Sequence, residues 1–245
     1  MNFLRLLALL LVAVPVTAAA ADTRPRVGLV LSGGGARGAA HVGVLKVLEE
    51  MRVPIDAIAG TSMGAVVGGL YASGLSAEEI DATLRAVNWE ELLGDRPPRD
   101  DLAFRRKEED RNFLVRLPLG LHGGEFRLPK GLVQGQRLNE LLRKLTLPVA
   151  TVHSFDALPT RFRAIATDLE SGERVVIASG DLTTAMRASL SVPGVFVPVE
   201  REGRLLVDGG LADNLPVDVA RAMGVDVLIV VDAGFPLLER DQLTT

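Results

Sequence analysis

Along the first third of the chain, continuous apolar runs alternate with segments in which apolar residues recur every three or four positions. The runs Arg26–Leu31 and Ile55–Ala59 are short and largely uninterrupted, which is typical of buried strands. The segment Ala39–Met51 between them carries valine and leucine at helical spacing. A strand, a helix and a second strand in this order predict an α/β domain built on a mainly parallel sheet.

The rest of the chain continues this alternation, with turn residues between the apolar segments. Helices are expected over Met63–Ser73, Ser76–Val87 and Leu138–Leu145, and strands over Arg204–Val207 and Val225–Val231. The second helix begins with a capping-box pattern, Ser76 followed by Glu79. Two hairpins are expected: Phe113–Leu119 with Glu125–Leu128, around a turn at Gly120–Gly124, and Phe162–Thr167 with Arg174–Ala178. The charged stretch Arg96–Arg111 is expected to be a solvated loop, and Thr183–Pro198 a helix end and turn without direct chemistry.

The first 21 residues follow a different pattern. Arg5 gives a weak positive start, Leu6–Val16 is an apolar core, and Thr17–Ala21 offers small residues for cleavage. Together these features predict a secretory signal peptide over residues 1–21, with one domain over residues 24–245. An uncleaved anchor is the weaker interpretation, because a membrane-spanning helix needs roughly 20 apolar residues. Export predicts the periplasm, the outer membrane or cell surface, or secretion as the location.

The composition argues against nucleic-acid binding, disulfides and metal sites. The net charge of -4 gives no general case for nucleic-acid binding. The chain has no cysteine, so disulfides and thiolate metal sites are excluded. Its three histidines, His41, His122 and His153, are not paired as metal ligands. We therefore expect no metal and no cofactor.

Ser62 lies in the sequence Gly60-Thr61-Ser62-Met63-Gly64, between a predicted strand and a helix rich in small residues. This G-x-S-x-G pattern is typical of a nucleophile elbow, in which the two glycines relieve crowding so that the turn can be sharp. The hydroxyl then stands at the positive end of a helix. The alternative is a strand-to-helix turn that happens to hold a serine, because the motif is short.

A glycine-rich loop follows the first predicted strand, and its Gly33, Gly35 and Gly38 satisfy G-x-G-x-x-G. Free N–H groups in such a loop can cradle an anion. A dinucleotide site would require an acidic residue closing the second strand, and a P-loop would require Gly-Lys-Ser/Thr at the helix start; neither is present. Beside an elbow the loop is better interpreted as an oxyanion hole. A side chain at Gly34 or Gly35 should then crowd the site or turn an N–H away from it.

A nucleophilic serine needs a base within hydrogen-bond reach. In α/β-hydrolases with a Ser-His-Asp triad the histidine comes last, and the final third of this chain has none. Asp208 stands at the end of a predicted strand, and Gly209 and Gly210 after it permit close approach to another loop. A Ser62–Asp208 dyad therefore accounts for more of the sequence than a triad, given an aspartate pKa raised by partial burial. An ordinary Asp-Gly turn is the alternative.

The three motifs together resemble the patatin-like phospholipases. The loop Gly33–Gly38, the elbow Gly60–Gly64 and Asp208-Gly209-Gly210 match that family's motifs in order. The resemblance implies a three-layer α/β/α sandwich, Ser62 as nucleophile and Asp208 as base. It also implies an oxyanion hole at Gly33, Gly34 and Gly35, with Arg37 beside it.

The implied activity is metal-free hydrolysis of fatty-acyl esters of phospholipids at a membrane surface, of the phospholipase A type. A lysophospholipase or general carboxylesterase with the same dyad is the alternative, and a phosphate- or nucleotide-binding protein is the alternative from another class. Nothing in the sequence excludes a homo-oligomer. With its signal peptide, the chain resembles the passenger domain of patatin-type outer-membrane autotransporters, which continue into a POTRA module and a β-barrel. We therefore expect its outer layer to be incomplete at Thr245.

Overall fold

The computed structural model describes residues 24–94, 104, 120–122, 125–127 and 131–234. The predicted signal peptide, the strand Phe113–Leu119 and, apart from Phe104, the predicted loop Arg96–Arg111 lie outside the described residues.

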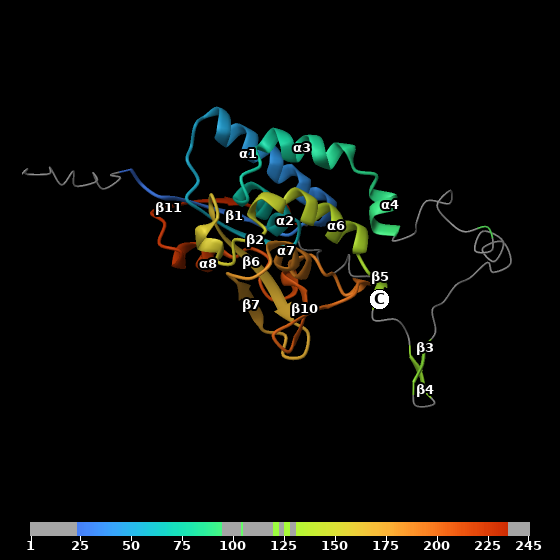
Figure 1. Ribbon diagram of the computed structural model, residues 1–245. Helices are drawn as coiled ribbons and strands as arrows, with labels where there is room; N and C mark the ends of the chain where they lie inside the picture. Colours follow the sequence, from blue (N-terminus) through green and yellow to red (C-terminus); the bar gives the residue numbers. More distant parts are fainter. Residues whose placement is uncertain (1–23, 95–103, 105–119, 123–124, 128–130, 235–245) are drawn as a thin grey trace, which may run out of the picture.

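A seven-stranded mixed sheet forms the centre of the molecule (Figure 1). Its main path runs β11-β1-β2-β6-β10-β9, and β7 pairs with β6 beside this path. The strands are β1 (Val27–Leu31), β2 (Ala57–Thr61), β6 (Arg161–Asp168), β7 (Arg174–Ile177), β9 (Val199–Arg201), β10 (Arg204–Asp208) and β11 (Val227–Val231). The pairs β11–β1, β1–β2 and β2–β6 are parallel, so the predicted mainly parallel α/β sheet is confirmed.

The strand β6 changes partners along its length. Thr61 at the end of β2 pairs with Ile165, and Asp208 at the end of antiparallel β10 pairs with the next residue, Ala166. Because β7 occupies the opposite edge of β6 here, β2 and β10 share one edge and meet end to end. The last residues of both strands are therefore brought together by the sheet itself.

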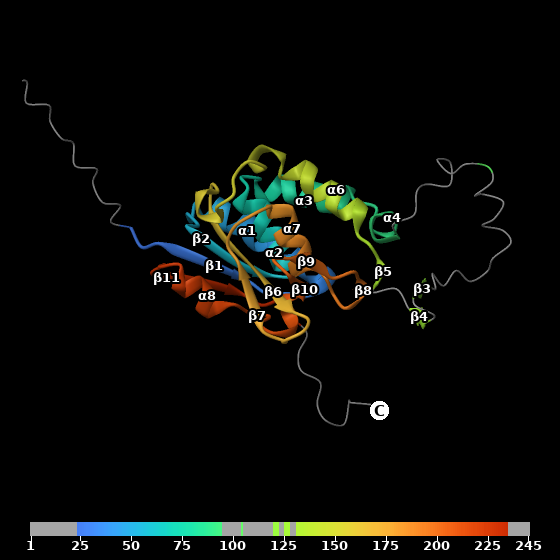
Figure 2. The same cartoon turned by 60° about the horizontal axis from the view of Figure 1, so that its bottom comes forward.

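Helices cover both faces of the sheet, unequally (Figure 2). The larger layer consists of the helices α1 (His41–Glu50), α2 (Met63–Ala72), α3 (Ala77–Ala86), α6 (Gln136–Leu145) and α7 (Leu182–Ser189). Alternating strand residues such as Leu29 and Ile58 pack in the large core under this helical layer. Their neighbours Val30 and Ala59 form a smaller core with α8 (Val217–Ala222) on the other face.

Local sequence signals explain where the helices begin and end. Ser76 and Glu79 form the predicted capping box at the start of α3. The helix α2 is buried on nearly every side, which is why it is uniformly apolar and small rather than amphipathic. Gly74, after the end of α2, has a positive φ of 104°, as expected of a glycine that terminates a helix.

Several short elements were not predicted from the apolar pattern. They are the 3-10 turns Gly35–Ala40, Leu147–Val149, Phe155–Ala157 and Gly209–Leu211, the helices α4 (Trp89–Gly94) and α8, and the strands β5 (Gly131–Val133), β8 (Gly194–Phe196) and β9. The hairpin β3 (Gly120–His122) and β4 (Glu125–Arg127) places a strand where a turn was predicted. Within the described part of the chain, no helix is long and apolar enough to cross a membrane.

Candidate active site

Ser62 occupies a one-residue elbow between β2 and α2, with φ of 54° and ψ of -122°. This backbone conformation is costly for a residue with a side chain. A Cβ on Gly60 would lie 2.5 Å from the carbonyl oxygen of Gly64, and one on Gly64 would collide with the carbonyl oxygen of Leu31. The flanking glycines are therefore required for α2 to turn back against β1 and β2.

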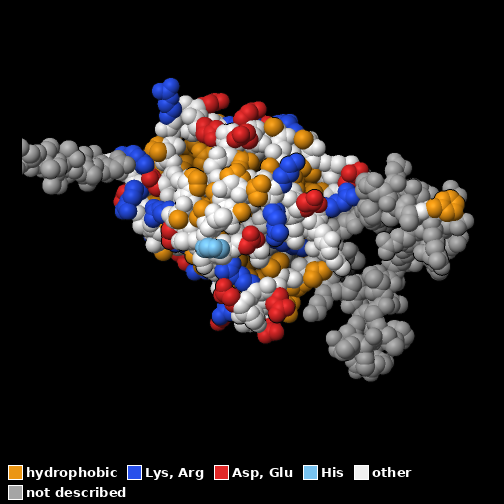
Figure 3. Space-filling view, in the orientation of Figure 1, with side chains coloured by type: hydrophobic (Ala, Val, Ile, Leu, Met, Phe, Trp, Pro, Cys, Tyr) orange, Lys and Arg blue, Asp and Glu red, His pale blue; other side chains and the backbone are white. Residues whose placement is uncertain are grey.

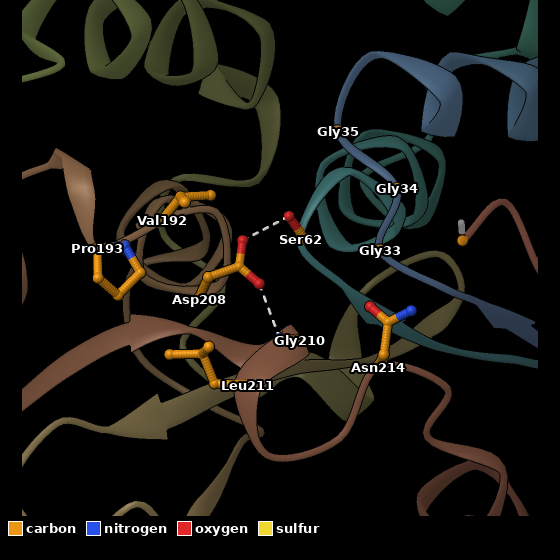
Figure 4. A pocket seen from close by; sticks show the side chains of 11 residues that line it. Gly33, Gly34, Gly35, Ser62, Val192, Pro193, Asp208, Gly210, Leu211 and Asn214 are labelled. Carbon is orange, nitrogen blue, oxygen red and sulfur yellow. Dashed lines mark hydrogen bonds between the residues drawn. The ribbon is translucent and has the colours of Figure 1, made fainter. Parts of the chain in front are cut away.

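Asp208 lies directly beside the serine (Figure 4). The Ser62 hydroxyl donates to Oδ2 of Asp208 over 2.6 Å, and the N–H of Gly210 donates to Oδ1 over 2.7 Å. The carbonyl of Asp208 accepts from the hydroxyl of Thr167 on β6. Both the backbone and the side chain of the carboxylate residue are thus held in place.

Burial sets the electrostatics of this pair. Ser62 is 5% exposed and Asp208 is 7% exposed. Desolvation raises the pKa of Asp208 above its usual value of 3.8, against the opposing effect of hydrogen bonds from Ser62 and Gly210. A carboxylate with a raised pKa is a stronger base, so this environment suits proton transfer from a serine.

The two glycines after Asp208 let its turn close against β6. A Cβ on Gly209 would collide with the carbonyl oxygen of Ile165, and one on Gly210 would lie 3.0 Å from Asp208 Oδ1. The segment Gly209–Leu211 forms a 3-10 turn with Asp208 as its N-cap. The turn thus places the carboxylate at the end of β2.

The glycine loop and the dyad line one pocket, which has a volume of about 260 Å³. Its lining includes Gly33, Gly34, Gly35, Ser62 and Asp208. The N–H of Gly33 donates to the carbonyl of Asn214, and that of Arg37 to the carbonyl of Gly34. Among the described residues, the N–H groups of Gly34 and Gly35 have no acceptor. These two amides are the donors that the loop leaves available to a bound oxyanion.

Gly34 and Gly35 oppose a side chain in different ways. A Cβ on Gly34 would lie 2.5 Å from the carbonyl oxygen of Ala233, whereas one on Gly35 would meet nothing within 4 Å. Gly35 instead has a positive φ of 55°, so a side chain there is opposed by backbone strain. Gly38 has another role, because its missing Cβ lets the loop pack on Met63.

Arg37 does not itself line the pocket. Its guanidinium donates over 3.5 Å to the carbonyl of Gly234, which does line it. Asn214, which the sequence did not single out, does line it, with its side chain between the glycine loop and the Asp208 turn (Figure 4). Its position six residues after Asp208, on the same turn, is the only signal that could have suggested it.

The histidines lie elsewhere. Nε2 of the buried His41 lies 2.8 Å from the carbonyl oxygen of Ser32, and burial lowers the pKa of its ring. His153 is exposed. Neither lines the pocket beside Ser62. In the part of the chain that the structure describes, no group of three or more histidine, cysteine or acidic residues could hold a metal ion.

A larger cavity of about 580 Å³ adjoins this pocket, and the two share Gly35, Ser62 and Val192 in their walls. Most of its wall is apolar, and its lining includes Met63, Leu84, Trp89, Leu138 and Phe196. Asp81 and Arg85, which form an ion pair with each other, are its charged lining residues. Ser62 therefore lies where the small pocket beside the glycine loop adjoins a larger, mostly apolar cavity.

Comparison with known proteins agrees with this arrangement. The family model for patatin-like phospholipases matches residues 29–221. An uncharacterised NTE family protein of Mycobacterium bovis is 36% identical over 210 residues, 86% of this chain and 49% of its own length. Patatin-like phospholipase domain-containing protein 7 of Rattus norvegicus is 33% identical over 85% of this chain, but this match covers only 14% of the rat protein.

Among solved structures, VipD from Legionella pneumophila aligns with a TM-score of 0.50 and 19% identity, over 79% of this chain and 47% of VipD. This likeness concerns the fold. The chain spans at most about half the length of these relatives. The family model covers most of the chain and all three motifs. The fold and the 36% identity to the Mycobacterium bovis protein agree with this match. The chain belongs to the patatin-like phospholipase family.

Proposed function

We propose that this chain is a lipid acyl hydrolase of the phospholipase A type, with Ser62 as nucleophile and Asp208 as its base. The observation that carries the proposal is the 2.6 Å hydrogen bond from the Ser62 hydroxyl to the Asp208 carboxylate. It lies at a pocket where the N–H groups of Gly34 and Gly35 have no acceptor among the described residues. Nucleophile, base and electrostatic stabiliser are the three parts that acyl transfer requires.

The geometry supports a two-step mechanism. Asp208 takes the hydroxyl proton as Ser62 Oγ attacks the ester carbonyl carbon, and the oxyanion that forms is stabilised by the amides of Gly34 and Gly35. Collapse of this intermediate releases the alcohol, a lysophospholipid, which takes the proton back from Asp208. Water then attacks the acyl-serine by the same route and releases the fatty acid.

The 580 Å³ cavity supports a long acyl chain as the group transferred. It begins at Ser62, and its largely apolar wall would remove the methylene groups of the chain from water, which is worth about 0.8 kcal/mol for each group. A lysophospholipase or carboxylesterase would use the same dyad, and the chain length accepted by this cavity distinguishes a lipid hydrolase from a short-chain esterase.

The glycine loop gives less support to phosphate binding. Of its amides, those of Gly33 and Arg37 already donate within the protein, so the loop presents fewer donors than a phosphate cradle uses. On the face seen in Figure 3, basic and acidic side chains are interspersed. This distribution offers no basic stripe for a nucleic acid.

Residues 1–21 support a further proposal, that the protein is exported and meets phospholipid at a bacterial membrane surface. Expression of the full chain, followed by cell fractionation and N-terminal sequencing of the mature protein, tests it. Cleavage after the small residues Thr17–Ala21 is expected, and a retained Met1 in the cytoplasmic fraction would contradict it.

A fluorophosphonate probe tests the activity, because it labels only an activated serine. We expect the wild type and Ser73→Ala to be labelled and Ser62→Ala to be unlabelled and inactive on phospholipid. Ser73 is a suitable control, since it is a buried serine whose hydroxyl donates to a backbone carbonyl at the far end of the same helix. A folded Ser62→Ala variant that still hydrolyses phospholipid would exclude Ser62 as the nucleophile.

A further inference from the structure

The turn at the end of α7, Ser189–Ser191, touches both members of the dyad. The Ser62 backbone N–H donates to the Ser189 hydroxyl over 2.8 Å, and the Asp208 backbone N–H donates to the Ser191 carbonyl over 2.8 Å. Nucleophile and base are 146 residues apart in the chain, yet each has its backbone tied to this one turn. The sequence indicated only a helix end here.

Ser189 fills the gap where two strands meet. On the shared edge of β6, β2 ends with Thr61 opposite Ile165, and β10 ends with Asp208 opposite Ala166. The fully buried Ser189 hydroxyl accepts from the N–H of Ser62 and donates to the carbonyl of Ile165. It thereby completes the hydrogen bonding between the elbow and β6 at the point where β2 leaves the sheet.

The turn is itself fixed from behind. Arg187 is 3% exposed, and its guanidinium donates to the Ser191 hydroxyl over 2.6 Å and to the carbonyl of Gln134. The same guanidinium stacks over the ring of Phe196, 4.3 Å from its centre. A turn anchored in this way can serve as a common reference for the positions of Ser62 and Asp208.

We propose that Ser189 is a positioning residue, which holds the strained backbone of Ser62 so that its hydroxyl points at Asp208. The inference rests on the proposed function, since it takes Ser62 to be the nucleophile. Without the hydroxyl, the buried N–H of Ser62 and the carbonyl of Ile165 lose their partner. The elbow, at φ of 54°, is then free to relax toward a less strained conformation. Oγ would move relative to Asp208, whose own backbone stays on the turn.

Ser189→Ala tests this directly. A displacement of about 1 Å can cost on the order of 100-fold in turnover, and we expect a loss of that size in kcat for phospholipid. KM should stay at the wild-type value, because Ser189 lines neither cavity. The rate of labelling by the fluorophosphonate should fall by the same factor as kcat, since the probe needs an aligned serine but no bound lipid.

Thr183→Val is the matched control. Thr183 lies on the same helix, is 4% exposed, and shares a buried hydrogen bond with the hydroxyl of Thr146, away from the site. It should lower the melting temperature and leave kcat unchanged. Ser189→Cys is measured in parallel, because it keeps the size of the side chain with a weaker hydrogen-bonding group.

The outcomes separate the two claims. A wild type that is neither labelled nor active would remove the proposed function, and this inference with it. A labelled wild type beside a folded Ser189→Ala with kcat as close to wild type as Thr183→Val would overturn the positioning role alone. If Ser189→Ala does not fold, a folded Ser189→Cys with wild-type kcat would overturn it instead. A fall in kcat and labelling in a folded Ser189 variant, with KM unchanged, supports it.

Discussion

Two neighbouring parallel strands end at the site, and they end differently. After β2 the chain turns into α2 through the single residue Ser62, which is almost fully buried. After β1 it passes through Ser32, Gly33 and Gly34 before the 3-10 turn Gly35–Ala40 begins. The first strand end presents a side chain held in a strained conformation, and the second presents backbone amides.

The difference matches what each part would do in the proposed mechanism. A nucleophile has to be directed at one atom, so its backbone is fixed on all sides, by flanking glycines, by Ser189 and by the strand β6. An oxyanion hole has to leave N–H groups unused, so its backbone cannot lie in the interior of a strand ladder or a helix. The short elbow and the open loop are two solutions to these opposite requirements.

Asp208→Asn tests the strand end that carries Ser62, because it changes the partner of the Ser62 hydroxyl. Of the substitutions considered, it should lower turnover the most. The amide keeps the size of the side chain but cannot take the proton from Ser62, so we expect kcat to fall about 100- to 10,000-fold. The measurement is phospholipid turnover, with circular dichroism to show that the variant is folded. An active Asp208→Asn would require another base.

The raised pKa of Asp208 gives the same variant a pH signature. Between 3.8 and the higher pKa of the folded state, the native protein binds more protons at this group than the unfolded chain does. The contribution of Asp208 to the free energy of unfolding therefore falls as pH rises through that window. Asp208→Asn should remove this fall and be at least as stable as wild type at pH 7. In the wild type, kcat should decline on the acidic side at a pH above 3.8.

Gly35→Ala tests the other strand end, the glycine loop whose backbone amides face the pocket. We expect it to lower turnover about 100- to 1,000-fold, the cost of losing one oxyanion donor, because the alanine moves the amide away from its positive φ. Gly172→Ala is the control, since Gly172 also has a positive φ, of 74°, and open space around its Cβ. Both should lose about 1–2 kcal/mol of stability. Equal turnover in the two variants would remove Gly35 from the oxyanion hole.

Leu84→Trp tests whether the large apolar cavity holds the acyl chain. This cavity borders both strand ends, since Gly35 and Ser62 line it together with Leu84. Each methylene excluded from the apolar wall costs about 0.8 kcal/mol, so hydrolysis of a dodecanoyl ester should fall roughly 10- to 100-fold. An acetyl ester should be cleaved as in wild type. Leu169→Trp, at a residue 47% exposed and outside the cavity, is the control. Equal losses for both esters would place the acyl chain elsewhere.

His41→Gln should have the smallest effect on turnover. His41 contacts the carbonyl of Ser32 ahead of the glycine loop, and glutamine can donate to the same oxygen. We expect activity within about ten-fold of wild type, compared with the much larger losses when a triad member is removed. Burial lowers the pKa of His41, so the wild type loses stability as pH falls below 6.5, and this variant should lose less. A loss of activity as large as that of Asp208→Asn would point to a triad.

Many of the strands and helices could be predicted because they depend on local sequence patterns. Apolar runs located β1, β2 and β6 to within about two residues, and the capping box located the start of α3. The hairpin of β6 and β7 is confirmed as well. An aspartate at a strand end, followed by two glycines, was enough to single out Asp208, and the structure places it against Ser62.

What could not be predicted depends on strand order and long-range contacts. The sharing of one edge of β6 by β2 and β10 leaves no trace in hydrophobic periodicity, because both strands are simply apolar. The hydrogen bond of Ser189 to Ser62 spans 127 residues, and a serine at a helix end has no distinguishing pattern. The strands β5, β8 and β9 have three residues each, too few to show an alternation.

The end-to-end meeting of β2 and β10 also has a consequence for folding. If Asp208 is the base, as proposed, no part of the chain before it can hold an activated Ser62, because Asp208 comes 146 residues later and is placed only when β10 has paired with β6. Contacts between residues so distant in sequence form slowly relative to helices. The time course of Ser62 labelling during refolding would therefore follow closure of the sheet and lag behind the recovery of helical signal.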